Sequence, residues 1–322
     1  FFSLFCHGFL VRAMEQAKTL KVGYAVSKKK KVKFFDGFTQ YLSAQGVECV
    51  ELDFLSGVPT QEVDLLVHKL VDEMANSGTD AAAGAMIANV EAYLRSHPRL
   101  PIVDPWDCVK KVMNRYEFHT ILSSVGVRCP PYALWDFTSD FTALAKEHRL
   151  EFPMMCKTVC SCGSKVTHRI AIVHDQAQLT SLPGQGYEAP VMLQNYVRHD
   201  GCVWKMYVVD QAVWVAKRPS IDAPPAVEAA IVDSQTFCQP QNPNDTAVLL
   251  GNGDMKEIDE AKLLQMARAT RAAMGLALFG IDVIVGTADK ELYVVDVNYF
   301  PGYKEIPNIH QLLLDYLRGQ VS

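Results

Sequence analysis

The stretch YVVDVNYFPG, residues 293–302, decides the fold because it places polar side chains inside an otherwise apolar, strand-like run. Successive side chains of a strand point to opposite faces, so Asp296 and Asn298 would share one face. The apolar residues of the stretch would occupy the other face: Tyr293, Val295 and Val297. A carboxylate and an amide side by side are oxygen ligands, and they predict a bound cation.

The segment around this stretch, LFGIDVIVGTADKELYVVDVN (278–298), is typical of a strand, a turn and a second strand. If Asp282 pairs across from Asp296, the turn is centred on Asp289 and both carboxylates lie on one face. With Asn298 they would form a set of three oxygen ligands, which suits Mg²⁺ with phosphate oxygens and water. The alternative is a set of polar residues on the wet side of a sheet, and the hairpin alone leaves both interpretations open.

Length and composition limit the number of domains and the classes of function that the chain can have. A chain of 322 residues exceeds most single hydrophobic cores, so we expect two or three domains. The formal net charge of -5 argues against a general nucleic-acid-binding role. Nine cysteines, an odd number, favour a reducing compartment, and we expect the cytoplasm, with a nuclear location also compatible. No stretch approaches the length of a membrane span, so no membrane insertion is expected.

The first 13 residues, FFSLFCHGFLVRA, precede Met14 and are apolar. They lack a basic start and are too short to cross a bilayer. We interpret 1–13 as a disordered or non-native extension and leave it out of the fold prediction.

Short strands and helices alternate in the amino-terminal third. Helical patterns around 33–45 and 80–97 separate four short apolar runs: KVGYAV (21–26), VECVEL (47–52), VDLLVHKL (63–70) and PIVD (101–104). This alternation predicts a parallel α/β sheet. We therefore expect a first domain over 14–110.

Beyond this domain the pattern changes to strands separated by turn residues, which favours antiparallel sheets. The runs are FPMMCKTV (152–159), HRIAIVH (168–174), APVMLQNYV (189–197), CVWKMYVVD (202–210) and QAVWVAKRP (211–219). A polar segment at 219–256 is expected to form loops, and a helix should follow from Asp259 to Gly275. The predicted subdomains cover 111–198 and 199–322.

Two lysines interrupt apolar strands: Lys157 in MMCKTV and Lys205 in CVWKMYVV. Such a lysine either extends its ammonium to solvent or presents it to an anion. Each alone favours the first interpretation, but together with the carboxylate hairpin they favour phosphate binding. The chain lacks a G-x-x-x-x-G-K-[ST] loop and the protein-kinase motifs. The segment CKTVCSC (156–162) lacks the spacing of a zinc site.

A series of motifs runs in order along the chain: VGYAVSKKKK, HKL, IVDP, NRYE, CKT…G…H, QNYV…WKMYVV, RPS, FGIDVIV and VVDVNYFPGY. In this order and spacing the chain resembles the inositol 1,3,4-trisphosphate 5/6-kinase family, from about Lys21 to Tyr303. The resemblance implies an α/β (α+β) protein with the ATP-grasp fold. In that fold an amino-terminal parallel α/β domain would be followed by two ATP-grasp subdomains with antiparallel sheets.

The resemblance also implies roles for single residues. ATP, as co-substrate, would lie between two β-sheets in contact with Arg115, Lys157, Gln194, Val197, Ser220 and Ser234. The inositol phosphate would contact Lys30, Lys69, His168, Lys205, Arg218, Asn298 and Gly302. A pair of Mg²⁺ ions would be held by Asp282, Asp296 and Asn298. The catalytic group would comprise Lys157, Lys205, Asp282, Asp296 and Asn298.

Two of the predicted substrate lysines have independent support. Lys30 follows the first strand and Lys69 ends VDLLVHKL, so both would project from the edge where open parallel sheets bind ligands. The other lysines of KKKKVK (28–33) are more typical of a solvated charge run. Two residues depart from the family pattern: Cys162 replaces a frequent histidine, and Cys238 replaces a serine expected near the nucleotide. Both bear on substrate range.

The implied reaction transfers the γ-phosphoryl group of ATP to a hydroxyl of an inositol tris- or tetrakisphosphate, of the 5/6-kinase or 1-kinase type. Positioning and charge neutralisation would supply most of the catalysis. Two alternatives are an ATP-grasp carboxylate-amine ligase and a non-catalytic inositol-phosphate-binding protein. The chain shows no strong interface signature, so a monomer is the default expectation.

Overall fold

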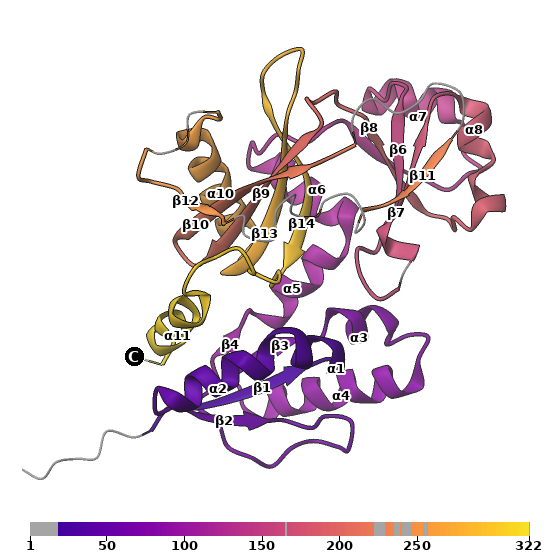
Figure 1. Ribbon diagram of the computed structural model, residues 1–322. Helices are drawn as coiled ribbons and strands as arrows, with labels where there is room; N and C mark the ends of the chain where they lie inside the picture. The colour runs from indigo at the N-terminus through magenta and orange to yellow at the C-terminus, as the bar shows by residue number, and fades with distance from the viewer. Residues whose placement is uncertain are drawn as a thin grey trace, which may run out of the picture.

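The computed structural model describes residues 19–164, 166–221, 229–234, 239, 246–253, 255 and 257–321, with only the backbone of Lys29. The predicted extension at 1–13 and the substitution at Cys238 lie outside these residues. Three β-sheets organise the described chain (Figure 1). Within it, no helix combines the length and the apolar character needed to cross a membrane.

The amino-terminal domain contains a four-stranded parallel sheet, as predicted, with the order β2-β1-β3-β4. Its strands are β1 (Lys21–Val26), β2 (Glu48–Glu51), β3 (Leu65–Lys69) and β4 (Ile102–Val103). Its helical segments are α1 (Lys28–Lys30), η1 (Lys31–Phe35), α2 (Asp36–Ala44), α3 (Val71–Asn76) and α4 (Ala81–Ser96). Lys30, in the helix after β1, and Lys69, the last residue of β3, therefore both lie at the carboxyl end of the sheet, where ligands of parallel sheets bind.

The central sheet is antiparallel and has the order β11-β7-β6-β8-β5. Its strands are β5 (Tyr132–Trp135), β6 (Met154–Thr158), β7 (Arg169–Val173), β8 (Val191–Asn195) and β11 (Ala230–Asp233). Short helices accompany them: α7 (Phe141–His148), η2 (Val166–His168), α8 (Gln176–Thr180) and η3 (Leu182–Gln185). The expectation that 219–256 is entirely looped is wrong, because β11 pairs with β7 and a further short strand also lies in this segment.

The carboxy-terminal sheet has the order β12-β10-β9-β13-β14 and is antiparallel as well. Its strands are β9 (Cys202–Val209), β10 (Ala212–Pro219), β12 (Val248–Leu249), β13 (Leu278–Val285) and β14 (Leu292–Tyr299). The expected helix is α10 (Glu260–Met274), which begins where the Asp259 side chain accepts from Lys262 N at 3.1 Å and ends at Gly275, with φ of 67°. Glycine has no Cβ, so it adopts this left-handed conformation more readily than other residues.

The predicted register of the hairpin is confirmed, because Asp282 pairs directly with Asp296. A β-bulge follows, so that Val283 pairs with Val294 and Val295 is the extra residue. The bulge shifts the alternation of side chains. Val294 and Val297 are buried while Tyr293 and Val295 are only partly buried, so the expectation that Tyr293 and Val295 share a face with Val297 is wrong.

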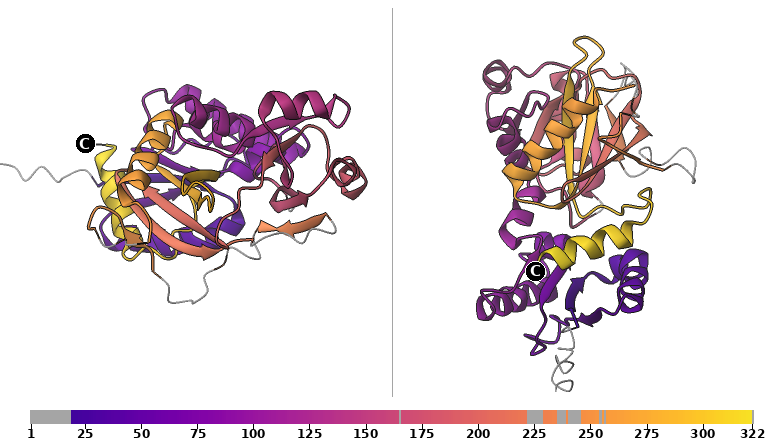
Figure 2. Two further views of the ribbon diagram at one scale, coloured as in Figure 1. Left: turned by 90° about the horizontal axis from the view of Figure 1, so that it is seen from above. Right: turned by 90° about the vertical axis from the view of Figure 1, so that its left-hand side faces the viewer.

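Two hydrophobic cores hold the three sheets. The first includes residues of the amino-terminal and carboxy-terminal sheets and of the linking helices α5 (Trp106–Met113) and α6 (Arg115–Ser124). The last helix, α11 (Ile309–Gly319), completes it and lies between the amino-terminal domain and the carboxy-terminal sheet (Figure 2). The second core belongs to the central sheet alone.

Candidate active site

The carboxylate pair lies on neighbouring strands of the carboxy-terminal sheet, next to a lysine on a third. Asp282 pairs with Asp296 on β14 and with Lys205 on β9. The Lys205 ammonium donates to Asp282 Oδ1 at 3.0 Å. Burial raises the pKa of the Asp282 carboxyl, and the Lys205 charge opposes this shift. A bound cation would favour the ionised form of both carboxylates.

Asp296 carries an unsatisfied oxygen. Its Oδ1 is buried and accepts no hydrogen bond from the described residues; the Arg115 Nε lies 3.9 Å away. Asn298 follows two positions later on the same strand and is partly buried. A buried acceptor without a donor costs free energy unless water or an ion completes it. The two carboxylates and the amide therefore fit a hard cation such as Mg²⁺.

A buried chain of hydrogen bonds supports Lys157, the lysine on β6. Its Nζ donates to Gln194 Oε1 at 2.7 Å and to Val295 O at 3.1 Å. Gln194 Nε2 lies 2.9 Å from His119 Nε2, and His119 Nδ1 lies 2.7 Å from Arg115 O. Since Nδ1 must donate to the carbonyl, Nε2 is the acceptor from Gln194, and the ring is neutral.

The electrostatics of this chain agree with a neutral ring. Burial, together with the positive charge of Lys157, lowers the pKa of His119 to about 3. Burial also lowers the pKa of Lys157 to about 8, against the opposing charge of Asp296. Lys157 is 4% exposed, so its ammonium is desolvated and directed toward the carboxylate strand. A desolvated ammonium interacts strongly with an anion placed beside it.

Arg115 begins α6 and is directed at the segment that follows β6. Its Nη1 donates to Thr158 O at 2.8 Å and to Cys160 O at 3.0 Å, and its Nη2 donates to Thr167 O at 2.9 Å. The guanidinium thus fixes the segment between β6 and η2. The predicted contact of Arg115 with ATP stays a prediction.

Val197 and Ser220, both predicted to contact ATP, are hydrogen-bonded to the same buried histidine, His199. His199 Nδ1 lies 2.8 Å from Val197 O, and His199 Nε2 lies 2.8 Å from Ser220 Oγ. The segment from Gln194 to Val197 therefore connects the central sheet to the end of β10 through defined hydrogen bonds. Ser234 lies elsewhere, directly after β11, and is partly buried.

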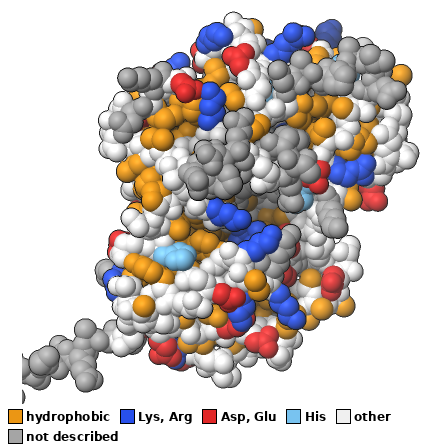
Figure 3. All heavy atoms as spheres, viewed as in Figure 1, with side chains coloured by type: hydrophobic (Ala, Val, Ile, Leu, Met, Phe, Trp, Pro, Cys, Tyr) orange, Lys and Arg blue, Asp and Glu red, His pale blue; other side chains and the backbone are white. Residues whose placement is uncertain are grey.

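A small basic cavity of about 200 Å³ brings together three predicted substrate residues: Lys30, Lys69 and Gly302. We call it the lysine cavity; its lining also includes Lys33 and Lys304, together with the phenylalanines Phe34, Phe35 and Phe300. Lysine and arginine side chains gather where the surface is hollowed between the lower and upper halves of the molecule (Figure 3). Four ammonium groups around an aromatic floor form a site suited to a polyanion.

Lys69 is the most constrained residue of the lysine cavity. Its buried Nζ donates to Tyr299 O at 3.2 Å and to Phe300 O. Burial and the nearby positive charge of Lys30 hold its pKa well below the usual value. The same lysine therefore connects β3 to the end of the carboxylate strand, and a bound anion would relieve the repulsion between the two ammonium groups.

His168 and Arg218 take different positions. Burial, with the charge of Arg115, lowers the pKa of the partly buried His168 at the end of η2. Arg218 is 2% exposed, and its Nη2 lies 3.0 Å from Glu305 Oε1. Glu305 also accepts from Tyr207 Oη at 2.5 Å. Arg218 is thus already paired with a carboxylate.

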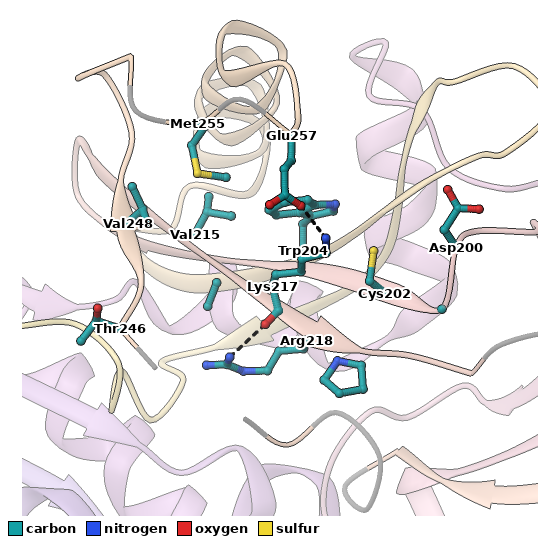
Figure 4. Close-up of a pocket in the computed structure, with 13 residues that line it drawn as sticks. Asp200, Cys202, Trp204, Val215, Lys217, Arg218, Thr246, Val248, Met255 and Glu257 are labelled. Atoms are coloured by element: carbon teal, nitrogen blue, oxygen red, sulfur yellow. Dashed lines mark hydrogen bonds and ion pairs between the residues drawn. The ribbon is translucent and has the colours of Figure 1, made fainter. Parts of the chain in front are cut away.

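A larger hollow of about 810 Å³ adjoins Arg218, whose Nη1 donates to Lys217 O at 3.0 Å (Figure 4). Its lining includes Asp200, Cys202, Trp204, Lys217, Met255 and Glu257. The Lys217 ammonium lies 5.2 Å from the Trp204 ring centroid and pairs with Glu257. Its two cationic side chains, Lys217 and Arg218, are already paired with carboxylates, and Asp200 adds a negative charge, so this hollow is less suited to a polyanion than the lysine cavity.

Sequence reasoning missed His119, Glu305, Lys33 and Lys304. The spacing of Arg115 and His119, four residues apart on one helix, puts both on one face and could have indicated His119. Lys304 follows the quoted stretch by two residues, and its charge beside Gly302 was an available signal. The ion pair of Glu305 with Arg218 joins residues far apart in the sequence, so no local sequence pattern could predict it.

Comparison with protein families finds two matches. Residues 21–109 match the inositol 1,3,4-trisphosphate 5/6-kinase pre-ATP-grasp domain, and residues 126–319 match the inositol 1,3,4-trisphosphate 5/6-kinase ATP-grasp domain. The inositol-tetrakisphosphate 1-kinase of Danio rerio is 26% identical, over 94% of this chain and 81% of the relative. The inositol-tetrakisphosphate 1-kinase 1 of Zea mays is 29% identical, over 92% of this chain and 87% of the relative.

Solved structures share the fold. A D-alanine–D-alanine ligase from Bacillus anthracis superposes with a TM-score of 0.65 at 16% identity, over 94% of this chain and 97% of that one. The ATP-grasp ligase PsnB, complexed with a minimal precursor, gives a TM-score of 0.62 at 16% identity, over 94% and 99%. These likenesses confirm the predicted ATP-grasp fold. With the two family matches over most of its length, the chain belongs to the inositol 1,3,4-trisphosphate 5/6-kinase family.

Proposed function

We propose that this protein is an ATP- and magnesium-dependent inositol polyphosphate kinase. It transfers the γ-phosphoryl group of ATP to a hydroxyl of an inositol tris- or tetrakisphosphate. The observation that carries this proposal is the position of the lysine cavity. Lys69, which lines the cavity, donates to the carbonyls of Tyr299 and Phe300, directly beyond the carboxylate strand.

The metal site in this proposal consists of Asp282, Asp296 and Asn298. The unsatisfied Asp296 Oδ1 supports it, as does the direct pairing of the two carboxylates across the hairpin. When bound, Mg²⁺ would neutralise charge on the phosphates of the nucleotide. A pair of ions is the expected number, because several phosphate oxygens must be brought together with the acceptor hydroxyl.

The nucleotide would occupy the space between the central and carboxy-terminal sheets. Lys157, directed at β14 from the central sheet, would contact its phosphates, and Lys205 would offset the charge on the group being transferred. Val197 and Ser220, both bonded to His199, would lie at the base and sugar end. Gln194 would act by orienting Lys157. Arg115 and Ser234 complete the proposed nucleotide contacts.

The inositol phosphate would place its phosphates against Lys30, Lys69 and Gly302, with Asn298, Lys205 and His168 nearer the reacting hydroxyl. Arg218 has Glu305 as its partner, so its proposed role is to shape the edge of the site rather than to bind a phosphate directly. The chain supplies positions and charges and needs no strong base, because the acceptor hydroxyl can lose its proton late in a loose transition state.

The carboxylate-amine ligase remains the second candidate because ligases share the fold. A ligase needs no cavity lined by four lysines, and this cavity favours the kinase. A non-catalytic binder would need no carboxylate pair at this position. Cytoplasmic location, a monomeric state and the absence of nucleic-acid partners are further parts of the proposal.

The test measures magnesium-dependent ATP consumption by the purified protein with a panel of inositol tris- and tetrakisphosphates. Amino acids and peptides serve as alternative acceptors. The expected product is an inositol phosphate with one additional phosphate, formed only with Mg²⁺. Turnover restricted to carboxylate and amine pairs would establish a ligase, and tight inositol phosphate binding without turnover would establish a binding protein.

A further inference from the structure

The segment 159–164, which we call the thiol loop, connects β6 to the region of η2 and contacts both α6 and α3. Arg115 holds the Cys160 carbonyl at 3.0 Å. Asn76 on α3 donates to Gly163 O at 2.9 Å, and Gly163 N donates to Asp72 Oδ1 at 3.1 Å. The thiol loop therefore joins the amino-terminal domain to the residue that begins α6.

Two thiols lie together in this loop. Cys160 Sγ lies 3.3 Å from Cys162 O, and Cys162 Sγ lies 3.4 Å from Val71 O. Both residues are partly exposed, and the next residue along, Ser164, is exposed. A small reagent can therefore reach the pair from solvent.

The two thiols differ in acidity. The hydrogen bond from the Cys162 side chain lowers the pKa of Cys160, and the positive charge of Arg115 adds to this effect. The same interaction, together with burial, raises the pKa of Cys162. A thiolate is the nucleophilic form of cysteine, so Cys160 is the more reactive member of the pair.

Four other described cysteines lie in environments that have the opposite effect on their acidity. Burial raises the pKa of Cys156 and raises that of Cys129 to about 12. Burial also raises the pKa of the partly exposed Cys49 and Cys202. Cys49 is thus a matched comparison for Cys160, because it is also partly exposed and its Sγ contacts the backbone oxygens of Thr39 and Val47.

We propose that Cys160 and Cys162 form a reversible thiol–disulfide exchange site for low-molecular-weight disulfides, in which Cys160 attacks and Cys162 resolves. Cys160 Sγ already lies 3.3 Å from the Cys162 carbonyl oxygen, so only a small movement of the loop separates the two residues from the geometry of a disulfide. Neither the kinase reaction nor its proposed metal site requires these thiols.

The exchange runs in two steps. The Cys160 thiolate attacks one sulfur of the disulfide R–S–S–R, so that a Cys160–S–S–R bond forms and one R–S⁻ leaves. Cys162 then gives its proton to a thiolate or to solvent and attacks the Cys160 sulfur, which releases the second R–S⁻. The protein loses two electrons and two protons as a dithiol, and the small disulfide is reduced to two thiols.

Closure of the bond would change the thiol loop. Cys162 Sγ, which lies 3.4 Å from Val71 O, must move to within bonding distance of the Cys160 sulfur, and the Cys160 carbonyl accepts a hydrogen bond from Arg115. This consequence rests on the proposed nucleotide site, to which Arg115 and Lys157 belong. Small displacements of positioning groups lower rates strongly, so we expect the KM for ATP to rise about tenfold in the oxidised form.

The experiment treats the reduced full chain with oxidised glutathione and follows each cysteine by mass spectrometry of its peptide. Wild type should form an internal Cys160–Cys162 bond, and dithiothreitol should reverse it. Cys162→Ser should stop at the mixed disulfide on Cys160. Cys160→Ser should prevent rapid modification, and Cys49→Ser should behave as wild type. ATP kinetics, normalised to each reduced variant, should change only where the bond forms.

Equal rates of modification at Cys160 and Cys49 would overturn the exchange site. An internal bond that leaves the KM for ATP unchanged would overturn its effect on the nucleotide. If the reduced protein phosphorylates no inositol phosphate, the proposed function fails on its own. The peptide masses and the binding of a fluorescent ATP analogue, before and after oxidation, still decide the thiol proposal in that case.

Discussion

The carboxylate hairpin and the lysine cavity are built in opposite ways. The hairpin consists of two long paired strands, and its carboxylates are partly buried on the strands themselves, where Asp282 forms an ion pair with Lys205. The lysine cavity combines one buried lysine, Lys69, with exposed ones such as Lys33 and Lys304 at the meeting of two domains. The first region has fixed geometry, whereas the second can adjust to its ligand.

The difference indicates a division of tasks. Phosphoryl transfer depends on atoms placed within fractions of an ångström, which buried strands can provide. Recognition of a ring with several phosphates depends on charge that can follow different arrangements of phosphates, which mobile lysine side chains provide. Substitutions in the hairpin should therefore lower kcat, and substitutions in the cavity should change KM for the inositol phosphate.

The largest effect is expected for Asp296→Asn. It keeps the shape of the side chain but removes the charge that would hold the metal, so kcat should fall about 10³-fold. Asp289→Asn, in the exposed turn of the same hairpin, is the matched control and should retain activity. Steady-state kinetics with saturating Mg²⁺ measure both variants. Full activity of Asp296→Asn would remove the hairpin from the chemistry.

The second largest effect is expected for Lys69→Met, which keeps a buried apolar side chain and removes the ammonium group. KM for the inositol phosphate should rise about 10²-fold, because one charge-assisted contact in a desolvated site is lost. The affinity for ATP, measured with a fluorescent analogue, should change little. A change in ATP affinity of similar size would erase the distinction between the two regions.

A third prediction tests the buried chain behind Lys157. The lowered pKa of His119 means that the unfolded chain binds a proton below its ordinary pKa of about 6.5 while the folded chain does not. Stability should therefore fall as pH decreases from about 6.5 toward 3, by up to about 1.4 kcal/mol per pH unit from this group. Burial also lowers the pKa of His68, to about 4, so this residue too makes the folded protein less stable as pH decreases.

His119→Gln should make this pH dependence shallower, whatever its effect on stability at pH 7. Urea unfolding at pH 6.5 and pH 5 measures the slope for both proteins. Burial raises the pKa of Asp104 to about 6, so this carboxyl has the opposite effect on stability in this pH range. Asp104 is present in both proteins, so its contribution cancels when their slopes are compared. An identical slope in both proteins would show that His119 is not held neutral.

The smallest effect is expected for Lys304→Ala. The ammonium is exposed and screened, so KM for the inositol phosphate should rise only about threefold, and more at low salt. Lys262→Ala, an exposed lysine on α10, provides the control for general loss of positive charge. Equal effects of the two variants would exclude Lys304 from the cavity's recognition role.

The sequence predicted those parts of the molecule that local patterns encode. The parallel sheet, the antiparallel hairpin and the pairing of Asp282 with Asp296 follow from alternation and turn residues. The approach of Lys30 and Lys69 follows from their positions at the ends of parallel strands. In each case the determining signal lies within a few residues of the site.

Features set by distant contacts escaped prediction. The sequence does not reveal the bulge at Val295, because Val294 and Val295 are both apolar and either one could face the core. The neutral state of His119 depends on Gln194, which is 75 residues away. The pairing of β11 with β7 depends on a chain reversal that its polar surroundings did not indicate. Such details require the assembled fold.

The division into two cores has a consequence for heating. The amino-terminal domain and the carboxy-terminal sheet share one core, and buried Asp104 accepts from the backbone of Ala277 and Leu278 between them, at 3.0 and 2.8 Å. These two parts should lose their structure together. The central sheet has a core of its own. In a calorimeter, a protein with three sheets is therefore expected to show two cooperative heat-absorption peaks, of which only the smaller belongs to the central sheet.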